Sequence, residues 1–264
     1  MNTRRTAKVI YAIWYREQVR FFRDKSRWLG LIIQPLLYLV LVGVGIASSM
    51  TFRGAAGGAN VSYLTFMYPG IVGMSVLFTA IFSGVGIIWD REFGFLKEVL
   101  VAPVPRWAVA IGKSLGIATT VLLQAAILLI LAPIAHVQLS VGSALGVLGV
   151  CALVGFSLGS LGIAIASRMQ SMEGFQFVMN VLVMPMFFLS GALFPLTGLP
   201  VWLSALAHID PLTYGIDALR NVIYVGGQAA RVLVQYSIGV DLLVVAALAA
   251  LLVLLGAWAF QTQP

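Results

Sequence analysis

The sequence predicts an all-α membrane protein with six transmembrane helices. Of its 264 residues 61% are hydrophobic and 9% are charged, whereas a soluble globular domain is about 25% charged. A helix needs about 20 apolar residues to cross a bilayer. Six segments meet that requirement: Trp28–Met50, Tyr63–Trp89, Trp107–Ala135, Val141–Ser167, Phe175–Phe194 and Asp241–Phe260. We therefore expect one six-helix domain over residues 28–260, preceded by a separate segment at residues 1–27.

Residues 1–27 carry eight of the sixteen Lys and Arg residues. On a helical wheel the apolar residues Ile10, Ile13, Trp14 and Phe21 share one face, Arg16, Arg20 and Arg23 lie beside it, and Glu17 falls within it. This pattern predicts an amphipathic helix in the membrane interface, in contact with anionic lipid. Glu17 would pair with a neighbouring arginine or a partner group. The alternative is a solvated, basic segment next to the membrane.

The segment from Asp90 to Lys113 is the largest polar interruption after the N-terminus, with five charges between Asp90 and Glu98. Each charge would cost roughly 2.5–3.5 kcal/mol at a bilayer centre, so we expect this segment outside the hydrocarbon. Apolar residues at 93, 96 and 100 give a helical stripe of about three turns. Pro103 and Pro105 would end that helix, because the residue before proline avoids the α conformation. On these grounds alone, a partner-binding helix and a solvated loop are equally compatible with the sequence.

The distribution of positive charge predicts the orientation. Thirteen of the sixteen Lys and Arg lie in the N-terminal segment, in the Asp90–Lys113 region or at Arg168. The positive-inside rule then places both termini in the cytoplasm of a multi-pass protein of the cell membrane. The same distribution argues against nucleic acid as a partner.

The sequence offers little catalytic chemistry. Gly112-Lys113-Ser114 resembles the end of a phosphate-binding loop, but the glycine required five positions earlier is replaced by Trp107. His136 and His208 lack metal-site spacing. We expect no cofactor, no metal and no catalytic residue in this chain, and an intramembrane enzyme is a remote alternative.

Several segments resemble a known family. D-R-E-F-G-F-L-K-E-V-L-V-A-P-V-P-R-W-A-V-A-I-G-K, from Asp90 to Lys113, resembles the signature of ABC-2 type transporter permeases. Met184–Pro195 and Ile209–Arg220 resemble the fifth span and the outer re-entrant segment of that family. The chain is more similar to the drug-efflux and nodulation-factor branch than to the O-antigen branch. Lys97 departs from many members, which carry a less basic residue there.

The resemblance implies a half-transporter that is not itself an enzyme. Two copies would form the channel, each seated on one of two cytosolic ATP-binding subunits that hold ATP and Mg²⁺. The helix over residues 91–102 would be the coupling helix, and the implied contact residues are Arg91, Glu92, Phe93, Gly94, Leu96, Lys97, Glu98, Pro103 and Arg106. The expected activity is export of an amphipathic, drug-like or lipid-like substrate. The alternative within the family is export of a polysaccharide or lipid-linked glycan.

The resemblance also implies a substrate pathway and an outer gate. The second and fifth spans would line the two-fold interface, with Phe78, Phe82, Met179, Phe187 and Phe188 as candidate pathway residues; ordinary packing is the alternative for each. Residues 195–235 would form the re-entrant gate, with Asp210, Pro211, Tyr214, Asp217 and Arg220 as its candidate residues. From their i, i+3 spacing, Asp217 and Arg220 would pair on one helix. We expect Asp241 at the membrane interface, because the residues after it nearly suffice to span the bilayer.

Overall fold

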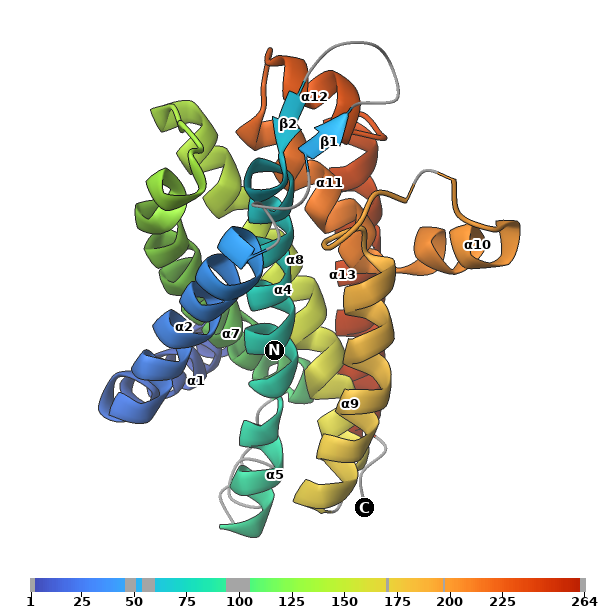
Figure 1. The fold of residues 1–264 in the computed structure, drawn as a ribbon. Coiled ribbons are helices and arrows are strands. Elements are labelled where there is room, and N and C mark those ends of the chain that lie inside the picture. Colours follow the sequence, from blue (N-terminus) through green and yellow to red (C-terminus); the bar gives the residue numbers. More distant parts are fainter. Residues whose placement is uncertain are drawn as a thin grey trace.

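The computed structural model is a helical bundle, which confirms the predicted all-α membrane class (Figure 1). It describes residues 3–45, 51–53, 60–93, 105–169, 171–196 and 198–261. The helices in chain order are α1 (Thr3–Arg23), α2 (Lys25–Leu37), the π-helix η1 (Tyr38–Val44), α4 (Tyr63–Phe82), α5 (Val85–Glu92), α7 (Arg106–Leu131), the 3-10 helix η2 (Ala132–Ala135), α8 (Val141–Arg168), α9 (Met172–Leu189), α10 (Val201–Ile209), α11 (Pro211–Ile223), α12 (Gln228–Leu233) and α13 (Ile238–Gln261).

Five helical segments of the described chain are long and apolar enough to cross a membrane: Tyr63–Glu92, Trp107–Ala135, Val141–Arg168, Met172–Leu189 and Ile238–Gly256. They coincide with five of the six expected spans. The remaining one, Trp28–Met50, is covered by α2 and η1, and its last five residues lie outside the described part. The count of six spans stays a prediction.

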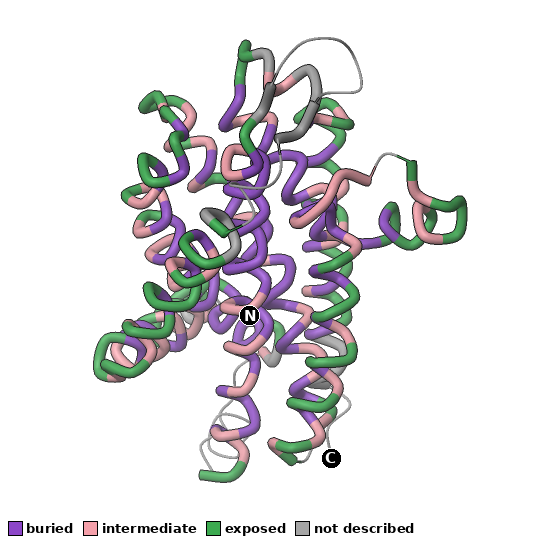
Figure 2. Tube along the Cα trace, viewed as in Figure 1, coloured by how far each residue is buried: buried purple, intermediate pink, exposed green. Residues whose placement is uncertain are grey.

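The centre of the bundle is α4, which is buried on nearly every side (Figure 2). A helix that is apolar all round belongs in a protein interior, and the buried side chains of α4 include Phe66, Tyr68 and Leu77. The hydroxyl of Tyr68 donates to the Leu128 carbonyl of α7 at 2.8 Å, so its one polar atom is satisfied.

Helices α7 and α8 pack side by side, as their short link predicts. Glycines of the small-xxx-small patterns allow this close approach. A Cβ atom on Gly155 would lie 2.8 Å from Val121, and one on Gly159 would lie 2.8 Å from Ile117. These two glycines therefore serve packing between α7 and α8.

The second span departs from expectation in two ways. It was expected as one helix ending at Trp89, but Ser83 and Gly84 form a turn that divides it into α4 and α5. Gly84 lies against the backbone of α8, where an added Cβ would be 2.7 Å from the Gly162 carbonyl oxygen. Gly/Ser pairs are common positions of helix kinks. The helical structure then continues to Glu92.

The segment between the first two spans contains regular structure. Two short strands, β1 (Thr51–Arg53) and β2 (Asn60–Ser62), pair antiparallel within it, with Phe52 opposite Val61. The outer segment 195–235 contains α10, α11 and α12, in agreement with the expected short helices. Helix α10 projects away from the bundle (Figure 1).

Candidate functional site: a charge cluster shared by α1, α5 and α7

A buried carboxylate near the end of α5 gathers cations from two other helices. Asp90 is 2% exposed. Its Oδ1 accepts a hydrogen bond from Arg16 Nη2 of α1 at 2.6 Å, and its Oδ2 accepts one from Lys113 Nζ of α7 at 2.5 Å. Arg20 Nη1 lies 3.4 Å from Oδ1. Hydrogen bonds between ionised groups are the strong ones, so Asp90 ties α1 and α7 to α5.

Glu17 completes this charge cluster, which we define as Arg16, Glu17, Arg20, Asp90 and Lys113. Glu17 Oε1 lies 3.1 Å from Lys113 Nζ and 3.5 Å from Arg16 Nη1. The expected pairing of Glu17 with a neighbouring arginine is confirmed, and Lys113 is a further partner. Two carboxylates thus face three cations. Desolvated ion pairs contribute little net stability, but loss of one member leaves a buried charge uncompensated.

Helix α1 approaches α7 closely because α7 presents glycines to it. A Cβ on Gly112 would lie 2.9 Å from Ile13 Cβ, and one on Gly116 would lie 2.9 Å from Glu17 Cβ. Gln18 Nε2 donates to the Gly116 carbonyl at 3.0 Å. Small residues of this kind let helix backbones approach one another in membrane proteins.

The predicted helix at the N-terminus is confirmed, but its apolar face is occupied by the protein itself. Ile13 and Phe21 are buried, whereas Tyr11, Tyr15 and Phe22 are the large exposed apolar side chains of α1. The other predicted residues of α1 divide between the two faces: Trp14 Nε1 donates to Thr119 Oγ1 at 2.9 Å, Arg16 and Arg20 join the cluster, and Arg23 is exposed.

Arg91, the first residue of the expected coupling helix, binds the end of α8. Its guanidinium donates to the carbonyls of Met169 at 2.6 Å and Ser167 at 2.7 Å. Cations are favourable at helix C-termini, where carbonyl groups lack helical partners. Through Arg91, α5 is therefore connected to the turn that joins α8 and α9.

The other predicted coupling residues lie at or beyond the end of α5. Arg91 and Glu92 belong to its last turn, and Phe93 follows in a turn, 81% exposed. Arg106 begins α7. Gly94, Leu96, Lys97, Glu98 and Pro103 lie outside the described residues. The helix at 91–102 stays a prediction. Its first two residues, Arg91 and Glu92, continue the helical structure of the second span.

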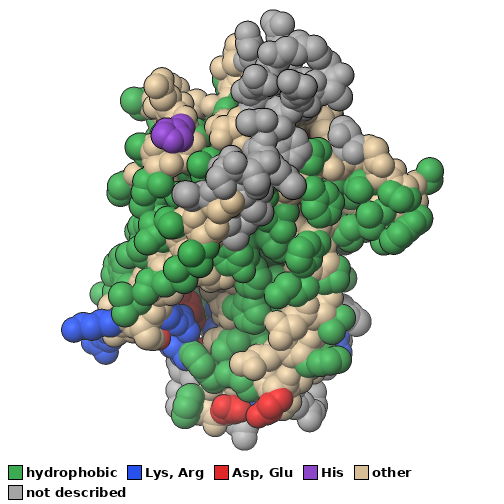
Figure 3. All heavy atoms as spheres, in the orientation of Figure 1, with side chains coloured by type: hydrophobic (Ala, Val, Ile, Leu, Met, Phe, Trp, Pro, Cys, Tyr) green, Lys and Arg blue, Asp and Glu red, His purple; other side chains and the backbone are tan. Residues whose placement is uncertain are grey.

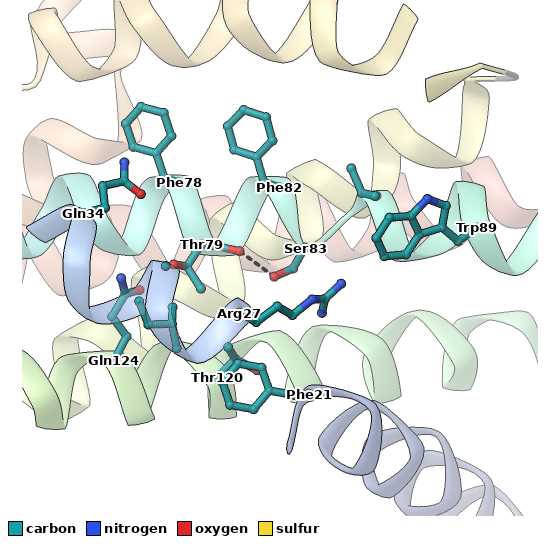
Figure 4. A pocket seen from close by; sticks show the side chains of 13 residues that line it. Phe21, Arg27, Gln34, Phe78, Thr79, Phe82, Ser83, Trp89, Thr120 and Gln124 are labelled. Atoms are coloured by element: carbon teal, nitrogen blue, oxygen red, sulfur yellow. Dashed lines mark hydrogen bonds between the residues drawn. The ribbon is translucent and has the colours of Figure 1, made fainter. Parts of the chain in front are cut away.

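A cavity of about 500 Å³ opens beside the cluster, between α1, α2, α4, α5 and α7 (Figure 4). Arg27 and Trp89 lie towards one end, and Gln34 and Phe78 lie towards the other. Phe78 and Phe82, both predicted pathway residues, line it with their rings stacked 5.9 Å apart. Its volume is within the usual range for small-molecule sites, about 300–1,000 Å³. Together with the cluster, it makes this end of the bundle the candidate functional region.

The predicted pathway residues of α9 are separated from this cavity lining. Met179 and Phe187 are buried in the core, whereas Phe188 is exposed. The described lining contains none of the three. Met179 and Phe187 pack within this chain, and the pathway role of the three α9 residues stays a prediction.

A second group of charged residues is buried at the opposite end of the bundle. Asp210 caps α11, accepting from the Leu212 amide at 2.9 Å, while Pro211 occupies the first helical position. The Tyr214 hydroxyl donates to the His208 carbonyl at 2.9 Å. Asp210 is therefore the N-cap residue of α11.

Asp217 and Arg220, expected to pair, instead take separate partners. Asp217 accepts from the backbone amides of Gln235 and Tyr236, at 3.0 and 2.7 Å. Arg220 donates to the Gly191 carbonyl at 2.6 Å and lies over the Phe66 ring. Longer-range attraction remains between the two side chains, since Asp217 opposes the effect of burial on Arg220.

Burial changes the ionisation of this second group. It raises the pKa of Asp210 to about 7 and also raises the pKa of Asp217. It lowers the pKa of Arg220 to about 10. Desolvation disfavours the charged form in each case. Asp241, at the start of α13, is fully buried and accepts from Asn221 Nδ2 at 3.1 Å.

Two members of the charge cluster were not identified from the sequence. The sequence places both residues at the ends of the charged Asp90–Lys113 segment, outside the hydrocarbon, and predicts no pairing of either with residues 1–27. The available signal was the position of Lys113, six residues into an expected span. An ionisable residue at such a position calls for a partner.

The fold and this region define the class of protein: a multi-pass helical membrane protein with a charge cluster at one end of its bundle. In the view of Figure 3, the coloured acidic and basic side chains all lie towards that end, and apolar side chains are spread over the described surface above them. No group of three or more potential metal ligands occurs among the described residues.

The chain belongs to the ABC-2 type transporter family, which matches residues 8–224. It is 31% identical over 196 residues to a putative transport permease, ycf38, of Cyanophora paradoxa, covering 72% of this chain and 65% of that protein. It is 29% identical over 215 residues to nodulation protein J of Rhizobium leguminosarum bv. trifolii, covering 80% and 79%. It is also 27% identical over 164 residues to the probable multidrug ABC transporter permease YbhR of Escherichia coli K12, covering 62% and 45%. The resemblance seen in the sequence is confirmed, and this chain is a transporter permease.

Proposed function

We propose that this chain is the membrane subunit of an ATP-driven exporter for an amphipathic, drug-like or lipid-like substrate. ABC-2 permeases normally pair with an ABC ATP-binding subunit. Here ATP and Mg²⁺ would reside on that separate subunit, two copies of which would serve two copies of this chain. The names of the relatives support export: one is a probable multidrug permease and another a nodulation protein.

The observation that carries the proposal is the way α5 is held. Asp90 connects it to α1 and α7, and the adjacent Arg91 connects it to the α8–α9 turn. A displacement of the segment that follows α5 would therefore act on four other helices at once. Packed elements of this kind move between discrete arrangements rather than deforming continuously.

The proposed orientation places both termini, the charge cluster and residues 91–102 in the cytoplasm of the cell membrane. The excess of Lys and Arg at this end supports it through the positive-inside rule. In this orientation the ATP-binding subunit contacts residues 91–102, and α10 to α12 lie at the outer face. Closure of the ATP-binding subunits on ATP would push α5 through this contact.

Charge reversal at Glu92 tests the proposal. Glu92 is exposed at the end of α5. In membranes containing this chain and its ATP-binding subunit, Glu92→Lys should reduce substrate-stimulated ATP hydrolysis and export of a fluorescent amphiphile at least tenfold. The protein should still insert, as measured by its membrane-extracted yield.

Glu173→Lys is the matched control, because Glu173 is also exposed but lies in the first turn of α9. Its effect on both activities should be less than twofold. Unchanged transport by a variant with alanine at Arg91, Glu92, Leu96 and Glu98 would show that the coupling assignment is wrong.

A further inference from the structure

The cavity between α1, α2, α4, α5 and α7 differs in chemistry along its length. At the end near the charge cluster, Arg27 and Arg20 lie over the Trp89 ring. The distance from the guanidinium carbon to the ring centroid is 5.7 Å for Arg27 and 5.0 Å for Arg20. Of these three residues, Arg27 and Trp89 line the cavity directly. Cation–π contacts of this kind hold arginine side chains in place.

Arg27 has donors to spare for a bound molecule. Its Nε lies 3.2 Å from Asp24 Oδ2. Its two terminal amino groups have no hydrogen-bond partner within the described part of the chain. Those amino groups form the outer edge of the guanidinium fork, which matches carboxylate and phosphate geometry. Figure 4 shows the guanidinium directed towards the Trp89 end of the cavity.

The carboxylate nearest to Arg27 is that of Asp24, which is partly exposed and contacts only Nε of the guanidinium. Both oxygens of Asp90 are already bound by Arg16 and Lys113. The lining of the cavity contains Arg27 but no acidic residue. An anionic group is therefore favoured there over a neutral or cationic one.

The middle of the cavity is polar without being charged. Ser83 and Thr120 donate their hydroxyl protons to helix carbonyls, at 2.6 and 3.2 Å, which leaves their oxygens as acceptors. Gln124 is 3% exposed, and its Oε1 has no hydrogen-bond partner in the described structure. A buried acceptor without a partner is costly.

The other wall is apolar. Phe78 and Phe82 project side by side from α4 (Figure 4), and Leu31 of α2 also lines the cavity. Stacked aromatic rings accept flat or hydrocarbon groups of many shapes. The cavity thus presents a cation, hydrogen-bonding groups and an apolar surface in one continuous space.

We propose that this cavity binds an amphiphile with an anionic headgroup, the headgroup on Arg27 at Trp89 and the apolar part on Phe78 and Phe82. This proposal rests on the proposed export function and specifies its substrate class. The same chemistry would suit an acidic lipid of the bilayer and an acidic exported compound.

Binding to the purified full-length chain in phosphatidylcholine nanodiscs tests the proposal without the ATP-binding subunit. The probes are dansyl-undecanoate and its uncharged primary amide, followed by dansyl fluorescence. The carboxylate should bind about tenfold more tightly than the amide, since a hydrogen bond to a charged group is the difference between them. Equal affinity of the two probes would overturn the proposal.

Three variants locate the effect. Arg27→Gln should abolish the preference for the carboxylate, and Arg27→Lys should retain most of it. Arg23→Gln, which removes the same charge from an exposed residue outside this cavity lining, should leave it unchanged. Phe82→Ala should weaken both probes equally. An equal loss of preference in Arg23→Gln and Arg27→Gln would mean general surface attraction and would refute the site.

Competition separates the two sources of the anion. Phosphatidylglycerol added to the nanodiscs displaces the probe if the natural occupant is an acidic lipid, and leaves it bound if the occupant is another acidic amphiphile. If both proposals hold, the Glu92→Lys variant should lose export and should still bind the carboxylate probe. Export intact with no carboxylate preference refutes this inference alone, and carboxylate binding without any ATP-driven export refutes the proposed function alone.

Discussion

Asp90→Asn is the sharpest test of the charge cluster as a structural connection. The substitution keeps the size of the side chain and removes its charge. Arg16 and Lys113 would lose the carboxylate that now lies 2.6 and 2.5 Å away. Lys113 is only 4% exposed, so water cannot replace the missing charge.

The expected loss in the free energy of unfolding depends on which ion-pair partners remain after each substitution. Breaking a buried ion pair costs about 3–5 kcal/mol, and Lys113 retains Glu17 at 3.1 Å, so the free energy of unfolding should fall by about 3 kcal/mol. Lys113→Met should cost less, about 1.5 kcal/mol, because Asp90 would keep Arg16. The double variant should be less destabilised than the sum of the two, by about 1–2 kcal/mol.

The assay is unfolding by sodium dodecyl sulfate in mixed micelles, monitored by tryptophan fluorescence. Asp24→Asn is the matched control, because Asp24 is a partly exposed acid and asparagine caps a helix as well as aspartate does. Its effect should be below about 1 kcal/mol. A loss under about 1 kcal/mol for Asp90→Asn, or strict additivity with Lys113→Met, would refute the reasoning.

Three further outcomes are expected. Gly116→Val should destabilise the protein by about 1–3 kcal/mol in the same assay, because its Cβ would lie 2.9 Å from Glu17; Gly149→Val, at a position with no atom within 4 Å, should not. Arg91→Gln should cost about 1–3 kcal/mol, since it removes two hydrogen bonds to the end of α8, and retained stability would argue against that connection. Burial raises the pKa of Asp210 to about 7, so the folded protein holds the proton of this carboxyl more tightly than the unfolded chain does. The stabilisation of the folded state that results is complete below about pH 4 and is lost as pH rises through 7. The wild type should therefore lose stability over that range relative to Asp210→Asn, and parallel pH profiles would contradict this assignment.

Local sequence properties were sufficient to predict most of the fold. Five spans follow from the length and hydrophobicity of their own residues, which need no knowledge of neighbouring helices. The turn at Ser83 and Gly84 depends instead on the backbone of Gly162, 78 positions after Gly84 in the chain. The Ser-Gly pair is a local feature that favours a kink, but the division of the second span also depends on that tertiary contact.

The candidate site shows the same division between local and tertiary information. Arg16, Glu17 and Arg20 were predicted because their helical spacing is local. Their partners Asp90 and Lys113 are separated from Arg16 by 74 and 97 positions in the chain, and only the packing of α1 on α7 brings them together. The cavity was not predicted either, since its lining comes from five helices, although its residues Phe78 and Phe82 had been selected.

The charge cluster and the cavity share a wall, which has a thermodynamic consequence. Arg20 lies 3.4 Å from Asp90 and also over the ring of Trp89, the preceding residue. An anion held beside Trp89 therefore acts on the same turn of α5 that the segment after Glu92 would displace. If an occupied cavity favours one position of α5, movement of α5 must change the affinity of the cavity by the same factor, because coupling between two sites is reciprocal. Under the proposed function, this one turn of helix would both report an occupied cavity to the ATP-binding subunit and release its contents when that subunit closes.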